Sequence, residues 1–152
     1  MLDDSFASGG AHLKSIFTEE RRVPADELVD LLRGVQVLNL ATVSSSGAPF
    51  VAPVDGLFFR GIWYFGSSTE SLRFRHLRAR PRVSASHTRG EELAVIAHGT
   101  AVEIDLSTPE HEGLRRYYIE TYGPDWEDWA AGVGAAYARL DATKMFAFRS
   151  RA

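Results

Sequence analysis

The 152-residue sequence contains no cysteine, and this absence excludes several kinds of site at once. Without thiols there are no disulfides, no cysteine nucleophile and no thiolate metal ligands. Long apolar runs are also missing, because none approaches the roughly 20 residues that a helix needs to cross a bilayer. The first fifteen residues carry two acids and no apolar segment, so they do not resemble a secretory signal. We therefore expect a cytoplasmic protein with no membrane partner.

Metal-binding and hydrolase patterns are absent as well. The five histidines show none of the spacings of zinc sites, so no metal is expected. No serine lies in a G-x-S-x-G turn, which leaves little support for a hydrolase triad. His87 and His98 could face each other across a hairpin, although a chance pairing is the simpler interpretation.

What the chain does have is enough apolar material for one packed domain. Hydrophobic residues make up 45% of the sequence, and the length suits one core. We expect residues 1–152 to form a single domain, with residues 1–20 loosely held. Apolar alternation, turn residues and helix signals predict about six strands with short helices between them. The expected strands are 35–43, 49–59, 62–65, 82–88, 93–106 and 136–148, and the expected helices are 24–33, 70–80 and 108–122.

The first strands are apolar on both faces, which requires cover on both sides. A small closed barrel whose outer face packs on another surface supplies that cover. The predicted fold is therefore mainly β with helical inserts: a six-stranded antiparallel split barrel. Because an uncovered outer face would expose a large apolar patch, we expect a homodimer.

Positive charge is concentrated in one part of an otherwise acidic chain. The net charge is −3, yet residues 60–89 hold seven arginines and only one acid, Glu70. Within this segment a serine-rich turn leads into a predicted helix, and a helix N-terminus offers free N–H groups to an anion. Hydroxyls and a guanidinium are suited to a phosphate or carboxylate. The candidate anion ligands are Ser67, Ser68, Ser71 and Arg73.

Two other interpretations of the basic segment remain open. The serines can be plain helix caps and the arginines solvated surface residues. A basic stripe can also bind nucleic acid, but the isoelectric point of about 5.9 lies well below the value above roughly 9 typical of such domains. The helix arginines, at positions 73, 75, 78 and 80, also spread around the helix instead of forming one face. No nucleic-acid partner is expected.

Two stretches of the chain resemble a known superfamily. LNLATVSSSGAPFVAPV and IWYFGSSTESLRFRHLRARPRVS are similar to the flavin-binding split-barrel proteins, which include pyridoxamine 5'-phosphate oxidase. The likeness is stronger to the flavin/deazaflavin oxidoreductase branch, and it covers roughly residues 25–149. The segment YYIETYGPDWEDW also resembles a helix-and-tryptophan segment of deazaflavin-binding members.

The resemblance implies a homodimer with two cofactor sites at the subunit interface. FMN is the first expected cofactor, and the deazaflavin coenzyme F-420 is the alternative. Arg73 would hold the cofactor phosphate, and the second strand would lie along the isoalloxazine ring. The cofactor-binding residues that it implies are Val51, Pro53, Val54, Ser67, Ser68, Ser71 and Arg73.

These observations predict an oxidoreductase that transfers hydride or electrons to a small organic substrate. A non-catalytic protein that binds or sequesters a flavin or a haem is the alternative, and a nucleic-acid binder is the third. No residue is identified as catalytic, because the cofactor ring would carry out the chemistry. Tyr64, Tyr122 and His98 are candidates for an acid or base. Trp126 and Trp129 either pack a helical cap or form part of a substrate pocket.

Overall fold

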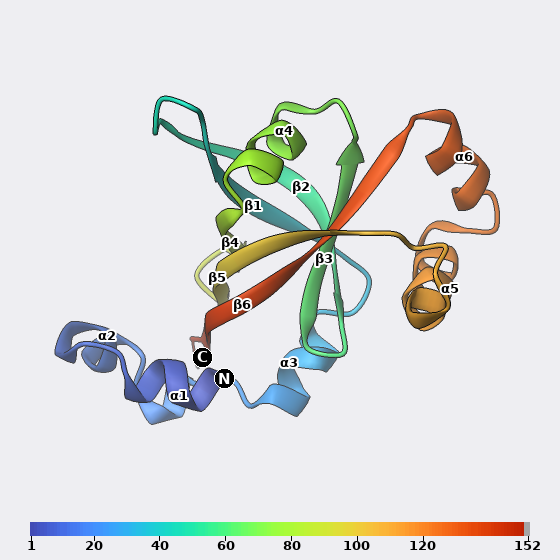
Figure 1. Ribbon diagram of the computed structural model, residues 1–152. Helices are drawn as coiled ribbons and strands as arrows, with labels where there is room; N and C mark the ends of the chain where they lie inside the picture. The colour runs from blue at the N-terminus through green and yellow to red at the C-terminus, as the bar shows by residue number, and fades with distance from the viewer. Residues whose placement is uncertain (151–152) are drawn as a thin grey trace.

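A closed barrel of six antiparallel strands forms the centre of the computed structural model, which describes residues 1–150 (Figure 1). Around the ring the strands follow the order β1, β2, β3, β6, β5 and β4, and β4 pairs with β1 to close it. This arrangement confirms the predicted mainly β barrel with helical inserts. The strands are β1 (Val35–Val43), β2 (Pro49–Phe59), β3 (Ile62–Ser68), β4 (Arg82–Arg89), β5 (Leu93–Ile104) and β6 (Ala135–Arg149).

Side chains of β1 and β2 alternate between the barrel interior and its outer face. Leu38 and Leu40 are buried inside, whereas Val37 lies on the outer face and is 52% exposed. On β2, Val51 is 70% exposed, while Val54 belongs to the core. The outer apolar face expected from the sequence is therefore present, and the single chain leaves this part of it open.

The barrel interior holds most of the large buried side chains. These include Trp63, Phe65, Phe74, Leu28, Leu32, Leu38, Leu140 and Val95. The helix α4 (Leu72–Ala79) contributes Phe74 and Leu77 to this core, and the ring of Phe74 lies 6.2 Å from that of Phe65. Burial of these side chains fixes α4, which carries the predicted anion site, against the barrel.

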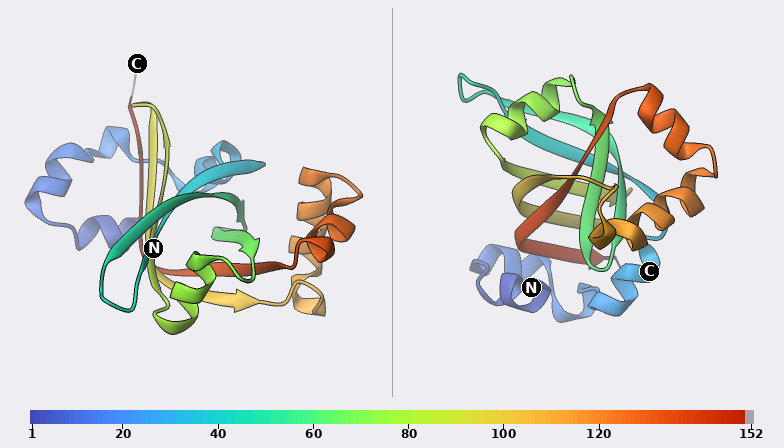
Figure 2. Two further views of the ribbon diagram at one scale, coloured as in Figure 1. Left: turned by 90° about the horizontal axis from the view of Figure 1, so that it is seen from above. Right: turned by 45° about the vertical axis from the view of Figure 1, so that its right-hand side comes forward.

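A second apolar cluster lies outside the barrel. The helices α5 (Glu112–Tyr122) and α6 (Trp126–Gly132) stand to one side of the strands, as Figure 2 shows. Leu114 and Tyr118 of α5 and Trp126 of α6 pack there with Leu57 and Tyr64 of the barrel. The two helices therefore cover one part of the outer face and leave the β1 side open.

The N-terminal residues form short helical segments beside the barrel. They are α1 (Leu2–Ala7), α2 (Ala11–Ile16), η1 (Glu19–Arg21) and α3 (Ala25–Leu31). In residues 1–20, expected to be loosely held, Ser5 is buried and its Oγ accepts a hydrogen bond of 3.0 Å from the backbone N–H of Met145. No helix in the described part of the chain is long and apolar enough to span a membrane.

The helices are shorter than the sequence patterns predict, for local reasons. The helix expected over residues 70–80 covers only Leu72–Ala79, because Ser71 caps its start and Arg80 precedes a proline, which disfavours helical backbone. The helix expected from Thr108 begins with a 3₁₀ turn, η2 (Pro109–His111). There the Thr108 hydroxyl donates to the carbonyl of Asp105 instead of capping the helix.

His87 and His98 do not face each other, which agrees with the preferred interpretation that their spacing is a chance one. In the β4–β5 hairpin His87 pairs with Val95, and His98 pairs with Ser84. His87 is buried, whereas His98 lies on the exposed face. A two-histidine site on this hairpin is therefore excluded.

Candidate cofactor site

The start of α4 is held to β2 by the first arginine of the helix. Ser71 has extended backbone angles, and its Oγ accepts a hydrogen bond of 3.4 Å from the N–H of Phe74, as expected for an N-cap. Arg73 lies in the first turn and donates from Nη2 to the carbonyl of Pro53 at 3.1 Å. The structure therefore brings together three predicted site residues, Pro53, Ser71 and Arg73.

The Arg73 side chain lines a small pocket of about 150 Å³. Partial burial disfavours its charged form and lowers the pKa of the guanidinium from a usual value far above neutrality. A guanidinium has five N–H donors, and the contact with Pro53 engages one of them. The pocket is lined by Leu40, Thr42, Phe50, Val51, Ala52, Ser71, Leu72, Arg73 and His76. A partly desolvated cation with donors to spare, beside a helix N-terminus, is suited to an anionic group.

His76 forms the inner wall of this pocket and is itself buried. Its Nδ1 lies 2.9 Å from the hydroxyl of Thr42, and its ring meets that of Phe50 edge to face at 5.1 Å. These contacts give His76 a packing role that positions the pocket wall.

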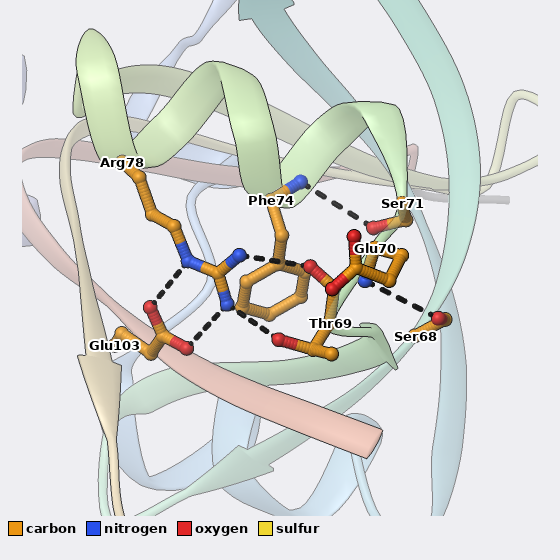
Figure 3. A network of polar contacts seen from close by, with 7 residues as sticks. All are labelled: Ser68, Thr69, Glu70, Ser71, Phe74, Arg78 and Glu103. Atoms are coloured by element: carbon orange, nitrogen blue, oxygen red, sulfur yellow. Dashed lines mark hydrogen bonds and ion pairs between the residues drawn. The ribbon is translucent and has the colours of Figure 1, made fainter. Parts of the chain in front are cut away.

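Arg78, one turn later, has a different role, shown in Figure 3. It donates from Nε and Nη2 to the two carboxylate oxygens of Glu103 at 2.8 and 2.7 Å. It also donates to the carbonyl and hydroxyl of Thr69, both at 2.8 Å, and its guanidinium lies 5.4 Å from the ring of Phe74. The hydrogen bond from Arg78 also lowers the pKa of Glu103. Arg78 therefore ties the turn before α4 to β5.

Two more arginines of the basic segment are engaged by the protein itself. Arg80 donates to the carbonyl of Val43 at 2.8 Å, and Arg89 donates to the side chain of Gln36 at 3.0 Å. The concentration of positive charge therefore has a structural component. Among these arginines, Arg73 is the one whose guanidinium opens onto a pocket with the helix N-terminus.

The structure separates Ser67 and Ser68 from Arg73. Both serines line a second pocket, of about 330 Å³, between the end of β3 and the helices α5 and α6. The Oγ of Ser68 also accepts a hydrogen bond of 3.3 Å from the N–H of Glu70. The pocket is lined by Asp55, Gly66, Ser67, Ser68, Tyr118, Tyr122, Trp126, Trp129, Val133, Ala135 and Tyr137.

This aromatic pocket is the part of the site that the sequence located least well. From the YYIETYGPDWEDW segment, a place in a substrate pocket is only one of two roles predicted for Trp126 and Trp129. Burial raises the pKa values of Tyr122 and Tyr137 to about 12, so both phenols stay protonated at neutral pH. Burial also raises the pKa of Tyr118, deeper in the cluster, well above its usual value. These groups act as neutral ring faces and hydrogen-bond donors.

The outward face of β2 connects the two pockets. Val51 borders the Arg73 pocket, Asp55 borders the aromatic pocket, and Pro53 lies exposed between them. At about 3.3 Å per residue this track spans roughly 13 Å. Val54 points the other way, into the barrel core, so only its backbone lies along the track.

The remaining candidates for acid or base chemistry lie apart. Tyr64 is buried in the outer cluster, and that burial raises its pKa. His98 lines an open groove of about 400 Å³ on β4 and β5, where its Nδ1 lies 2.7 Å from the hydroxyl of Ser84. Within residues 1–150 no cluster of acids and histidines is arranged to hold a metal ion.

Solved structures share this fold at low sequence identity. A FAD-binding protein from Mesorhizobium loti has a TM-score of 0.63 and 21% identity, over 86% of this chain and 98% of that one. An F420 reductase has a TM-score of 0.59 and 20% identity, over 76% and 93%. HutZ, a haem storage protein from Vibrio cholerae, has a TM-score of 0.68 and 18% identity, over 84% and 95%. At this identity the likeness establishes the barrel fold alone.

Comparison with models of protein families gives a more specific result than comparison with solved structures. No curated protein sequence matches the chain significantly. The model of the pyridoxamine 5'-phosphate oxidase family matches residues 24–149, from the start of α3 to the end of β6. This match covers the barrel, the Arg73 pocket and the aromatic pocket, and it agrees with the resemblance seen in the sequence. The chain belongs to the pyridoxamine 5'-phosphate oxidase family.

Proposed function

We propose that this protein binds a flavin-type cofactor and transfers hydride or electrons between it and a small organic molecule. FMN is the preferred cofactor and the deazaflavin coenzyme F-420 is the alternative. The observation that carries the proposal is Arg73: a partly buried guanidinium at a helix N-terminus, hydrogen-bonded to the strand that leads to the aromatic pocket. Family membership supports it, as do structural neighbours described as a FAD-binding protein and an F420 reductase.

The two pockets suit the two ends of such a cofactor and its substrate. Arg73 and Ser71 would bind the phosphate, and the exposed edge of β2 at Val51 and Pro53 would lie along the ring system. When bound, the ring supplies the redox chemistry. The residues of this chain hold it, orient it and limit its contact with water.

The test is a titration of purified protein with FMN and with coenzyme F-420, followed by cofactor absorbance and fluorescence. We expect saturable binding of one cofactor, and oxidation of its reduced form by an acceptor faster than by oxygen alone. A panel of quinones, enones and tetrapyrroles would identify the acceptor class. Tight cofactor binding with no turnover on any acceptor would favour a non-catalytic flavin binder, and binding of neither cofactor would contradict the proposal.

A haem-binding role is the second candidate, and the exposed position of His98 in the groove on β4 and β5 favours it. Its Nδ1 contacts Ser84, which leaves Nε2 as the atom able to ligate iron. The neighbour HutZ is described as a haem storage protein. A Soret band that forms on adding haemin and is lost in His98→Ala would support this role. Binding of nucleic acid, the third candidate, is less favoured because Arg78, Arg80 and Arg89 bond to the protein itself.

We also propose that the protein is a homodimer. Exposed apolar side chains gather on β1, β2 and α4, at Val35, Val37, Phe50, Val51 and Leu72. A surface of this kind on a specific dimer buries more than about 1,000 Å² in total. Light scattering should therefore give twice the 16.8 kDa chain mass at micromolar concentration.

A charge placed on this face should separate the two subunits. Val37→Asp is expected to give the monomer mass, because an unpaired carboxylate in an apolar interface is costly. Val29→Asp is the matched control, since Val29 is similarly exposed but lies on α3, away from this face. A monomeric wild-type protein, or a dimer that tolerates Val37→Asp, would contradict the proposed interface.

A further inference from the structure

We propose that the aromatic pocket between β3, α5 and α6 binds a planar ring compound that carries no negative charge. We assign this pocket to the substrate, next to the cofactor track on β2. The assignment to the substrate rests on the proposed function, whereas the binding of such a ring by the pocket does not.

Parallel and perpendicular aromatic rings build the walls of the pocket. Tyr118 is central: its ring stacks on Trp126 at 4.8 Å and 19°, and lies nearly parallel to Tyr122 at 6.0 Å and 13°. Tyr137 meets Tyr118 edge to face at 5.2 Å. Aromatic rings favour offset stacked and edge-to-face partners, so these walls can receive a further flat ring.

Part of the aromatic surface is open. Trp129 is 61% exposed and Tyr122 is 42% exposed, and both line the pocket. Single exposed apolar side chains are common on protein surfaces. Large aromatic side chains that gather around one concavity are instead typical of a ligand site. A volume of about 330 Å³ lies at the small end of ligand pockets, which suits a compound of one or two rings.

The strand beneath the pocket is shaped to admit Tyr137. A Cβ atom at Gly66 would lie 2.6 Å from the Tyr137 ring, which is closer than real contacts allow. Glycine in the interior of a strand marks such a close approach. The Tyr137 ring therefore lies close against β3 at Gly66, and both residues line the pocket.

The charge of the lining selects against anions. Asp55 is the one formal charge among the described lining residues, and no lysine, arginine or histidine is among them. Ser67 and Ser68 add neutral hydroxyls, and the phenols stay protonated because burial raises the pKa values of Tyr122 and Tyr137 to about 12. Aromatic faces beside a carboxylate attract cations and repel anions.

The two pockets therefore have opposite preferences. The Arg73 pocket offers a cation to an anionic group, and the aromatic pocket offers Asp55 and ring faces to a neutral or cationic ring. A ring that bears its own phosphate, as vitamin B6 phosphates do, fits the aromatic pocket poorly. The substrate class is a planar ring compound that is uncharged or cationic.

Three probes of similar shape and different charge test this inference. Calorimetric titrations of the 152-residue protein at neutral pH would use 1-methylquinolinium, quinoline and quinoline-3-carboxylate. We expect the cation and the neutral ring to bind at least about tenfold more tightly than the anion. Equal or tighter binding of the carboxylate, or no binding of any probe at millimolar concentration, would overturn the inference.

Two variants locate the bound ring. Trp129→Ala should weaken binding of the cation and of the neutral probe by about tenfold, because it removes a stacking surface. Asp55→Asn should weaken binding of the cation only, and Asp128→Asn, on the same side of the molecule but outside the lining, should change neither. Unchanged affinity in Trp129→Ala would place the ring elsewhere and overturn the inference.

The titrations are repeated with saturating FMN. This distinguishes a failure of the pocket inference from a failure of the proposed function. Continued probe binding in the presence of FMN assigns the pocket to the substrate. Competition between the probe and FMN would mean that the cofactor ring occupies the pocket, which overturns the substrate assignment. FMN binding without probe binding would leave the proposed function intact and remove this inference alone.

Discussion

Replacing Arg73 by alanine is expected to raise the dissociation constant for FMN by about tenfold to a hundredfold. A hydrogen bond to a charged group contributes about 1.5–3 kcal/mol, and about 1.4 kcal/mol corresponds to a factor of ten in binding. The guanidinium is partly desolvated and lies at the start of α4, both of which strengthen its attraction for a phosphate. The apo protein should keep nearly the same melting midpoint, because within residues 1–150 the side-chain hydrogen bond that is lost is the one to Pro53.

The matched control for this prediction is Arg75→Ala. Arg75 lies on the same helix, is exposed, and makes no side-chain hydrogen bond or ion pair within the described residues. Arg78→Ala is less suitable, because it breaks the contacts with Glu103 and Thr69 and is expected to lower stability as well. Equal, small losses in Arg73→Ala and Arg75→Ala would show that α4 does not bind the phosphate. Salt should weaken wild-type binding only modestly, since one phosphate is neutralised.

Phe74→Ala is expected to destabilise the protein by about 3–5 kcal/mol, the usual cost of removing a buried phenylalanine ring. Phe74 is fully buried and packs between α4 and the barrel, close to Phe65 and beneath the guanidinium of Arg78. For a chain of this size the melting midpoint should fall by roughly 10 °C. Because Phe74 holds the helix that carries Ser71 and Arg73, cofactor binding should weaken too, even below the melting range.

Leu72→Ala is the control for the effect of Phe74→Ala on stability alone, because Leu72 itself lines the Arg73 pocket. Leu72 is on the same helix but is 46% exposed, so its loss should cost far less stability. Thermal and denaturant unfolding of both apo variants measures the difference in stability. A Phe74→Ala protein as stable as the Leu72→Ala protein would show that α4 is not anchored through the core.

The barrel and the start of α4 could be predicted because their signals are local. Alternating apolar residues, turns and a serine before a helix are read within a few positions. The same alternation separates Val51 and Pro53 from Val54, since neighbours on a strand face opposite sides. The superfamily resemblance places a whole strand along the ring and does not make that distinction.

Other features depend on contacts between residues far apart in the sequence. Arg78 and Glu103 lie 25 residues apart in the sequence, so no local pattern predicts that Arg78 bonds to the protein itself. Ser67 and Ser68 line the aromatic pocket because α5 and α6 pack beside the end of β3. No local sequence pattern predicts that packing. The space that Gly66 leaves for the Tyr137 ring likewise exists only once β3 and β6 are paired.

The placement of α5 and α6 outside the barrel has a consequence for how such proteins diversify. Their cluster, with Tyr118 and Trp126, is separate from the cluster inside the barrel. Substitutions on these helices can reshape the aromatic pocket without disturbing the packing that supports Arg73. One barrel can thus keep the Arg73 pocket while drift and selection alter the neighbouring helices. That separation allows recognition of new compounds to evolve without rebuilding the scaffold.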